Sequence, residues 1–114
     1  IIDLTDESTL ELTTVSSAII TDYSSVIYDA CLLDVPSVFY CPDYKDYERG
    51  FYLKFPDDLP GEMITEPEKL LCTIRNTVSS PDKEKTEKFK LQQLSACDGN
   101  SSKKVAELIK SWLA

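Results

Sequence analysis

The fold of this chain is decided by the stretch AIITDYSSVIYDACLL at residues 18–33. Its first four residues, Ala18–Thr21, form a short apolar run, which is typical of a strand buried on both faces of a parallel sheet. A turn of two residues follows, and the apolar residues after Ser25 predict a buried helix that ends near Leu33. The stretch therefore predicts a strand, a turn and a helix in direct succession.

A second strand is expected soon after this helix. Pro36 ends the helix, because the residue before a proline is pushed out of the α region. The next residues, Ser37–Cys41, again form an apolar run of the parallel-sheet type. The connection between the two strands is short and helical, as in a parallel strand–helix–strand unit.

Upstream, the sequence predicts a further strand and helix. Ser8 and Glu11 have the spacing of a capping box, so a short helix is expected from Ser8 to about Ser17. Ile1–Leu4 is expected to be the end of a strand. The apolar residues of the short helix are expected to face the core; they are Leu10, Leu12 and Val15. The resulting order βαβαβ predicts right-handed crossovers and a doubly wound α/β layer.

Downstream, the pattern becomes mainly helical. Residues 42–61 form a long connection rich in proline and glycine, and a connection of that length in a compact domain is usually functional. A last short strand is expected at Met63–Thr65. Three helices should follow, at Glu66–Val78, Pro81–Ala96 and Ser101–Leu113.

Composition narrows the class of protein. The 114 residues are 42% hydrophobic and 28% charged, which favours a globular domain. The net charge of −8 argues against nucleic-acid binding, which needs a basic surface. There is no histidine, so any step that needs an imidazole lies outside this chain. The only methionine is Met63, and we therefore expect the chain to be a piece of a larger protein.

The cysteines and the hydropathy pattern point to a reducing, aqueous environment. The four cysteines, Cys31, Cys41, Cys72 and Cys97, contain no CxxC pair, which argues against a zinc site. Each has apolar neighbours, so all four are expected to be small buried hydrophobes. No apolar run approaches the roughly 20 residues that span a bilayer, and no signal peptide is recognised.

The strongest candidate site is the turn Thr21-Asp22-Tyr23-Ser24-Ser25. Ligands of open α/β sheets bind at the carboxyl ends of strands, and a helix start with serine hydroxyls suits a phosphate. Asp29 lies one helical turn beyond Ser25, where a carboxylate can accept hydrogen bonds from ribose hydroxyls. Alternatively, a serine only caps the helix and Asp29 faces solvent.

Two further segments are candidates. In Asp43–Phe55, the guanidinium of Arg49 could bind a phosphate, with Gly50 giving the backbone freedom beside it. Alternatively, the tyrosines and Phe51 pin a long loop to the core while Arg49 neutralises nearby acids. The turn Asp98-Gly99-Asn100-Ser101-Ser102 is best explained as the cap of the last helix.

A series of motifs follows along the chain: Ile20–Val26, Asp29, Pro36, Phe39-Tyr40, Asp43, Tyr47, Arg49–Tyr52, Pro60-Gly61 and the turn at Asp98–Ser102. In these motifs and in their order the sequence resembles the CDP-glycerol glycerophosphotransferase family, whose members build or prime teichoic-acid-like polyol-phosphate polymers. The resemblance runs from about Ile2 to Leu113.

This resemblance implies a two-lobed GT-B fold, of which the chain would be most of the C-terminal, Rossmann-like lobe. Residues 1–61 would hold the sheet core and donor loops, and residues 62–114 the helical part. The turn at 21–25 is also similar to the Thr-Asp-Ser-Gly-Gly turn of nucleotide-sugar enzymes. The implied substrate-binding residues are Thr21, Asp22, Ser24, Ser25, Asp29, Arg49 and Gly61, with the serines on the diphosphate and Asp29 on the ribose.

The implied reaction is attack of an acceptor hydroxyl on the β-phosphorus of CDP-glycerol, with release of CMP and without a cofactor or metal. The catalytic histidines of the family would lie upstream of Ile1, so we expect a fragment that binds CDP-glycerol, CDP or CMP and is inactive alone. The implied partners are a polyol-phosphate acceptor and the missing N-terminal lobe, in a cytoplasmic enzyme peripheral to the inner face of the bacterial membrane. Because a lobe cut within its sheet exposes an edge or an apolar face, a homodimer of the fragment is also expected.

Two other functions remain open at this stage. The chain could be the same lobe of another nucleotide-sugar transferase or epimerase, although the segment Asp43–Tyr52 favours the first family. It could also be a non-catalytic α/β interaction domain whose serines act only as a helix cap.

Overall fold

A computed structural model describes residues 1–47 and 52–114 of the chain. The elements follow in the order α1 (Thr9–Val15), β1 (Ile19–Thr21), α2 (Val26–Leu32), β2 (Ser37–Tyr40), the short 3₁₀ helix η1 (Tyr44–Asp46), β3 (Glu62–Ile64), α3 (Pro67–Ser79), α4 (Lys83–Gln93) and α5 (Ser101–Leu113).

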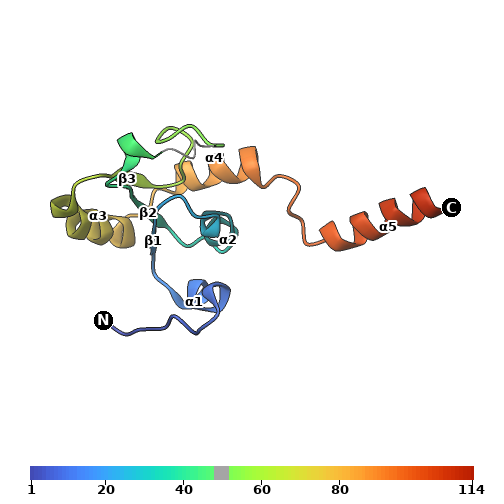
Figure 1. Ribbon diagram of the computed structural model, residues 1–114, viewed down its shortest axis with the longest axis horizontal. Helices are drawn as coiled ribbons and strands as arrows, with labels where there is room; N and C mark the ends of the chain where they lie inside the picture. Colours follow the sequence, from blue (N-terminus) through green and yellow to red (C-terminus); the bar gives the residue numbers. More distant parts are fainter. Residues whose placement is uncertain (48–51) are drawn as a thin grey trace.

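The three strands form one parallel sheet in the order β1-β2-β3. Ile20 pairs with Val38, and Phe39 pairs with Met63. Figure 1 shows α3 on one side of this sheet, and α2 with α4 on the other. The predicted α/β class, a short parallel sheet flanked by helices, is confirmed.

The main core lies between the sheet and α2. Phe39 and Cys41 are fully buried at the centre, and Phe89 of α4 closes the cluster. Leu53 and Leu59, from the connection between β2 and β3, pack into the same cluster. Residues 52–61 of the long connection are therefore anchored to the core, which holds this part of the connection close to the edge of the sheet.

The first predicted strand is absent. Ile1–Leu4 has no strand structure and is exposed. The side chain of Asp3 instead accepts a hydrogen bond from the backbone N–H of Thr5 at 3.0 Å, and the N–H of Glu7 donates to the carbonyl of Leu4 at 3.0 Å. These local bonds form turns and compete with strand pairing, so the predicted βαβαβ order is wrong at its first element.

The predicted capping of α1 is confirmed, but its predicted buried face is not. The hydroxyl of Ser8 accepts a hydrogen bond from the N–H of Glu11 at 3.4 Å. Leu10 is 54% exposed and Val15 is 82% exposed, while Thr13 is the buried residue of the helix. The face of a seven-residue helix that is buried depends on what packs against it, here α2, and sequence periodicity over two turns does not reveal that.

Two other burial predictions are also wrong. Within the described sheet β1 is an edge strand, and its Ile20 is 50% exposed rather than buried on both faces. Cys31 and Cys41 are buried as expected, but Cys72 and Cys97 are exposed. Apolar neighbours in the sequence do not decide which way a side chain points from α3 or from the link after α4.

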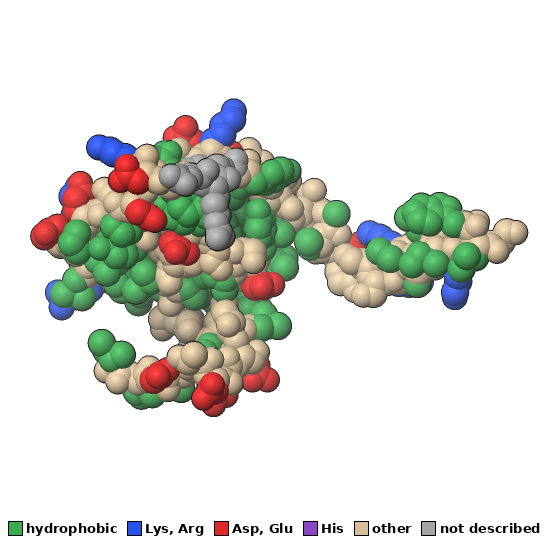
Figure 2. Space-filling model, viewed as in Figure 1, with side chains coloured by type: hydrophobic (Ala, Val, Ile, Leu, Met, Phe, Trp, Pro, Cys, Tyr) green, Lys and Arg blue, Asp and Glu red, His purple; other side chains and the backbone are tan. Residues whose placement is uncertain are grey.

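The last helix stands apart from the rest of the molecule. α5 extends away from the sheet and its helices (Figure 1), and all of its residues are exposed. Hydrophobic side chains are visible along it in Figure 2. Across the described ranges 1–47 and 52–114, none of the helices has both the length and the apolar character needed to cross a membrane.

Candidate functional site

The candidate site lies where β1 and β2 end. Because the strands are parallel and in register, Thr21 at the end of β1 pairs with Phe39 near the end of β2. The turn from Asp22 to Ser25 then leads into α2. The carboxyl ends of neighbouring parallel strands are where open α/β sheets bind ligands, so the turn occupies the predicted position.

The two serines differ in what their hydroxyls do. The hydroxyl of Ser24 accepts a hydrogen bond from the N–H of Val26 at 3.3 Å. Ser25 is the N-cap residue of α2, but its side chain makes no capping hydrogen bond. Both serines are exposed. The capping alternative therefore applies to Ser24, and the hydroxyl of Ser25 stays available to a ligand.

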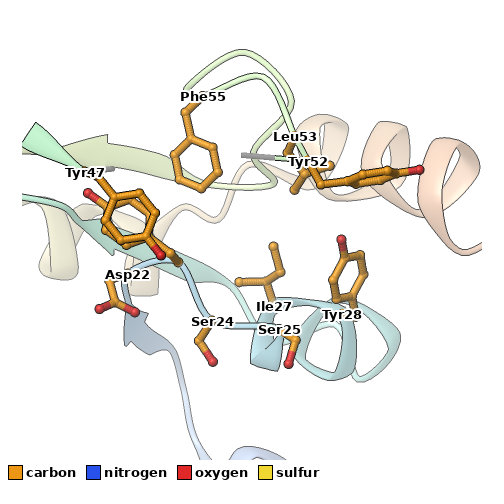
Figure 3. Close-up of a pocket in the computed structure, with 10 residues that line it drawn as sticks. Asp22, Ser24, Ser25, Ile27, Tyr28, Tyr47, Tyr52, Leu53 and Phe55 are labelled. Carbon is orange, nitrogen blue, oxygen red and sulfur yellow. The ribbon is translucent and has the colours of Figure 1, made fainter. Parts of the chain in front are cut away.

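A hollow of about 170 Å³ adjoins this turn. Figure 3 shows its two sides: aromatic rings, including Tyr47, Tyr52 and Phe55, lie on one, and the turn with Asp22, Ser24 and Ser25 lies on the other. The serine hydroxyls point away from the rings in this view. The arrangement offers apolar ring faces beside an open polar edge, a combination that suits a ligand with both a flat apolar part and a charged part.

Tyr23 connects this turn to the segment after β2. Its ring lies on the ring of Tyr47, with centroids 3.8 Å apart and planes 31° apart. Its hydroxyl donates a hydrogen bond to a carboxylate oxygen of Asp43 at 3.0 Å. A second, more open hollow is bordered by Asp22, Tyr23, Ser24, Asp43 and Tyr47. The two hollows thus share part of their lining, including both rings.

Two titratable groups of the site, the half-buried Tyr23 and the buried Cys41, stay protonated. Burial, followed by the hydrogen bond to Asp43, raises the pKa of Tyr23 well above its usual value. Burial also raises the pKa of Cys41. Tyr23 is therefore a hydrogen-bond donor throughout the physiological pH range. Among the described residues, no group of three or more acidic or cysteine side chains is placed to hold a metal ion.

The predicted site residues are only partly brought together. Asp22, Ser24 and Ser25 border the first hollow. Thr21 borders a separate shallow hollow with Ile20, Asp22 and Tyr40. Asp29 is exposed on α2. It is not one of the described residues that line the first hollow. Arg49, with Gly50 and Phe51, lies outside the described residues.

Gly61 is placed at the opposite end of the sheet. It immediately precedes β3, and it borders a hollow together with Ser37, the first residue of β2. A Cβ atom at Gly61 would collide with the carbonyl oxygen of Ser37. The structure therefore gives Gly61 a packing role and does not bring it to the turn at 21–25.

The third candidate segment is a turn, as predicted. A carboxylate oxygen of Asp98 accepts a hydrogen bond from the N–H of Asn100 at 2.9 Å, and its other oxygen accepts one from Lys104 at 2.7 Å. Gly99 between them has a φ of +77°, which favours glycine. The segment thus shapes the start of α5.

Sequence reasoning missed some residues of the first hollow, above all Tyr28 and Phe55. Tyr28 lies three residues after Ser25, and residues three apart share a helix face, so the spacing could have revealed it. Phe55 gave no such signal, because its place depends on how the long connection returns to the core. The alternative that tyrosines pin this connection fits Tyr44, whose hydroxyl donates to the carbonyl of Phe55 at 3.0 Å.

Comparison with known proteins finds relatives that match nearly the whole chain. A teichoic acid ribitol-phosphate primase of Bacillus spizizenii is 40% identical over 99% of this chain, and the match spans 30% of that protein. A teichoic acid poly(glycerol phosphate) polymerase of Staphylococcus epidermidis is 36% identical over 87% of this chain, which is 14% of its own length. The chain thus spans at most about a third of these relatives.

A solved structure gives the same result. The wall teichoic acid polymerase TagF superposes on 96% of this chain with a TM-score of 0.78 and 34% identity, and the match covers 28% of that chain. The predicted fold, part of a GT-B-type lobe, is therefore confirmed. The family model for CDP-glycerol:poly(glycerophosphate) glycerophosphotransferases matches residues 1–111. With a match over nearly its whole length, the chain belongs to the CDP-glycerol:poly(glycerophosphate) glycerophosphotransferase family.

Proposed function

We propose that this chain is the donor-binding part of a transferase that moves glycerol phosphate from CDP-glycerol to a polyol-phosphate acceptor and releases CMP. The observation that carries the proposal is the family match over residues 1–111, together with the polar turn at the carboxyl edge of the sheet. A TagF structure was soaked with CDPG, which fits a donor of this kind.

In the proposed complex the polar side chains of the turn hold the donor. The free hydroxyl of Ser25, with Ser24, Thr21 and Asp22, would face the diphosphate, and Asp29 on the next turn of α2 would accept hydrogen bonds from the ribose. Asp22 and Asp43 are both carboxylates, so the diphosphate needs a cation there, and Arg49 is the candidate within the chain. Gly61 borders a different hollow and would contribute through the packing of β3 against β2.

The chain supplies donor binding without proton transfer. It has no histidine, so the general base for the acceptor hydroxyl would come from another part of the enzyme. Positioning and charge stabilisation would dominate the phosphoryl transfer itself. The whole enzyme would be a cytoplasmic protein bound to the inner face of the bacterial membrane, and residues 1–114 would be one nucleotide-binding unit of its C-terminal lobe.

The direct test is calorimetric titration of the chain with CDP, CMP and UDP. We expect CDP to bind more tightly than UDP, and Ser25→Ala to weaken CDP binding by roughly 1–2 kcal/mol, the scale of a hydrogen bond to a charged group. Ser102→Ala is the matched control, because Ser102 is an exposed serine of α5, far along the chain from the turn.

The other outcomes assign the other functions. A clear preference for UDP would indicate a different nucleotide-sugar transferase or epimerase. An absence of heat with all three nucleotides would contradict donor binding and favour an interaction domain. Equal affinities of the parent chain and Ser25→Ala would remove Ser25 from the site.

A further inference from the structure

We infer that Tyr23, through its hydrogen bond to Asp43, is a positioning residue that fixes the turn bearing Ser24 and Ser25 for the donor. This inference rests on the proposed function and concerns the same site. The residues of the turn differ in burial: Asp22, Ser24 and Ser25 are exposed, whereas Tyr23 between them is half-buried.

The turn has little else to hold its conformation. Ser25 makes no side-chain cap, and the bond from the N–H of Val26 to the hydroxyl of Ser24 is long, at 3.3 Å. Hydrogen bonds of this length are at the weak end of the range. The orientation of the two exposed serines therefore depends on Tyr23, which directly precedes them.

The ring of Tyr23 provides an anchor on one side. It lies 3.8 Å from the ring of Tyr47 and 5.7 Å from that of Phe55, measured between centroids. Aromatic rings in contact attract each other beyond the effect of the area they bury. This contact places the ring, but stacked rings can still slide over one another.

The hydroxyl of Tyr23 removes that freedom. Its hydrogen bond to Asp43, at 3.0 Å, joins residues 20 positions apart in the sequence. Tyr23 follows β1 and Asp43 follows β2, so the bond links the two loops at the carboxyl edge of the sheet. A bond to a carboxylate is stronger than one between neutral groups, and burial keeps the phenol protonated to donate it.

The same bond also directs the carboxylate of Asp43. Asp43 borders the second hollow, which Tyr23 and Ser24 also line. The bond therefore fixes where this negative charge lies relative to the turn.

The test compares two tyrosine variants that each lose one hydroxyl. Tyr23→Phe removes the bond to Asp43, and the control Tyr44→Phe removes a bond of the same length, 3.0 Å, to the carbonyl of Phe55. We expect similar small decreases in Tm for both. The Kd for CDP should rise about tenfold in Tyr23→Phe only, because a bond to a charged group contributes on that scale.

Variants of Asp43 complete the test. Asp43→Asn keeps a side-chain oxygen that accepts the bond, so it should retain more CDP affinity than Asp43→Ala. The double variant Tyr23→Phe/Asp43→Ala should bind no more weakly than the weaker of the two single variants, because each of them already lacks the Tyr23–Asp43 bond.

Three results would overturn the inference. The Kd of Tyr23→Phe could equal that of the parent chain, or Tyr44→Phe could raise the Kd equally, which would indicate general loosening. In either case the parent chain still binds CDP, so the proposed function stands. If the parent chain itself binds no CDP, the proposed function fails, and this inference fails with it.

Discussion

Gly61 matters at the scale of the single residue because it lets two strands approach. It lies beside Ser37, where β2 begins, and a Cβ atom there would collide with the Ser37 carbonyl oxygen and lie 3.3 Å from the ring of Phe39. Neither neighbour can move easily: Ser37 is held in β2, and Phe39 is fully buried. The glycine of the Pro60-Gly61 motif is thus explained by packing.

We therefore expect Gly61→Ala to destabilise the chain by about 1–3 kcal/mol, the usual cost of overpacking. Urea unfolding followed by circular dichroism measures this change. Gly99→Ala is the comparison: Gly99 has a φ of +77° and no atom within 4 Å of an added Cβ, so it should lose only the cost of the left-handed backbone, about 1–2 kcal/mol. Equal stability of Gly61→Ala and the parent would refute the steric explanation.

At the scale of the element, α4 shows how one residue can hold a polar helix. Ten of its eleven residues lie at least partly at the surface, and Phe89 is its one buried residue. The Phe89 ring packs on Tyr28 of α2, with centroids 5.5 Å apart. Lys90 adds an ion pair with Asp34, at 2.5 Å, after α2. Asp34 is 73% exposed, and such pairs contribute only about 0–1 kcal/mol.

Because burial outweighs this ion pair, Phe89→Ala should cost about 3–5 kcal/mol of folding free energy. Hydrogen exchange should then show that the amides of α4 lose protection before those of the sheet. Leu91→Ala is the control, since Leu91 is 74% exposed on the same helix and should change stability by about 0.5 kcal/mol or less. A Phe89→Ala variant no less stable than Leu91→Ala would show that α4 is held by other contacts.

The elements also show what the sequence can predict. The N-cap at Ser8, the helices α2 to α5 and the strands β2 and β3 carry local signals in spacing, proline and apolar runs, and they form where expected. Ile1–Leu4 and Ile20 differ because strand pairing and burial depend on neighbours in space. The same holds for the site: the turn at 21–25 is set by adjacent residues, whereas Phe55 reaches it through a long connection.

At the scale of the whole molecule, α5 leaves an apolar side exposed. Val105, Leu108, Ile109 and Trp112 follow helical spacing and are 46–74% exposed. Apolar stripes of this kind are normally covered by another surface. The homodimer predicted from the sequence could use this side of α5.

We therefore expect the chain to self-associate in a concentration-dependent manner, as measured by light scattering after size-exclusion chromatography. The variant Leu108→Lys/Ile109→Lys should remain monomeric, because two charges interrupt the stripe. Lys110→Gln, which changes the charge of α5 without touching the stripe, should associate like the parent. A parent chain that is monomeric at every concentration would contradict the homodimer.

The exposure of α5 also gives the molecule a built-in optical signal. Trp112 is the only tryptophan, and it is 74% exposed. Its indole is therefore surrounded mostly by water in the isolated chain, and its fluorescence should be quenched readily by iodide. When any surface covers α5, the emission should shift to shorter wavelength and the quenching should fall. When tryptophan is excited selectively, the emission of this chain thus reports on contacts of α5, without the tyrosines that lie at the turn after β1.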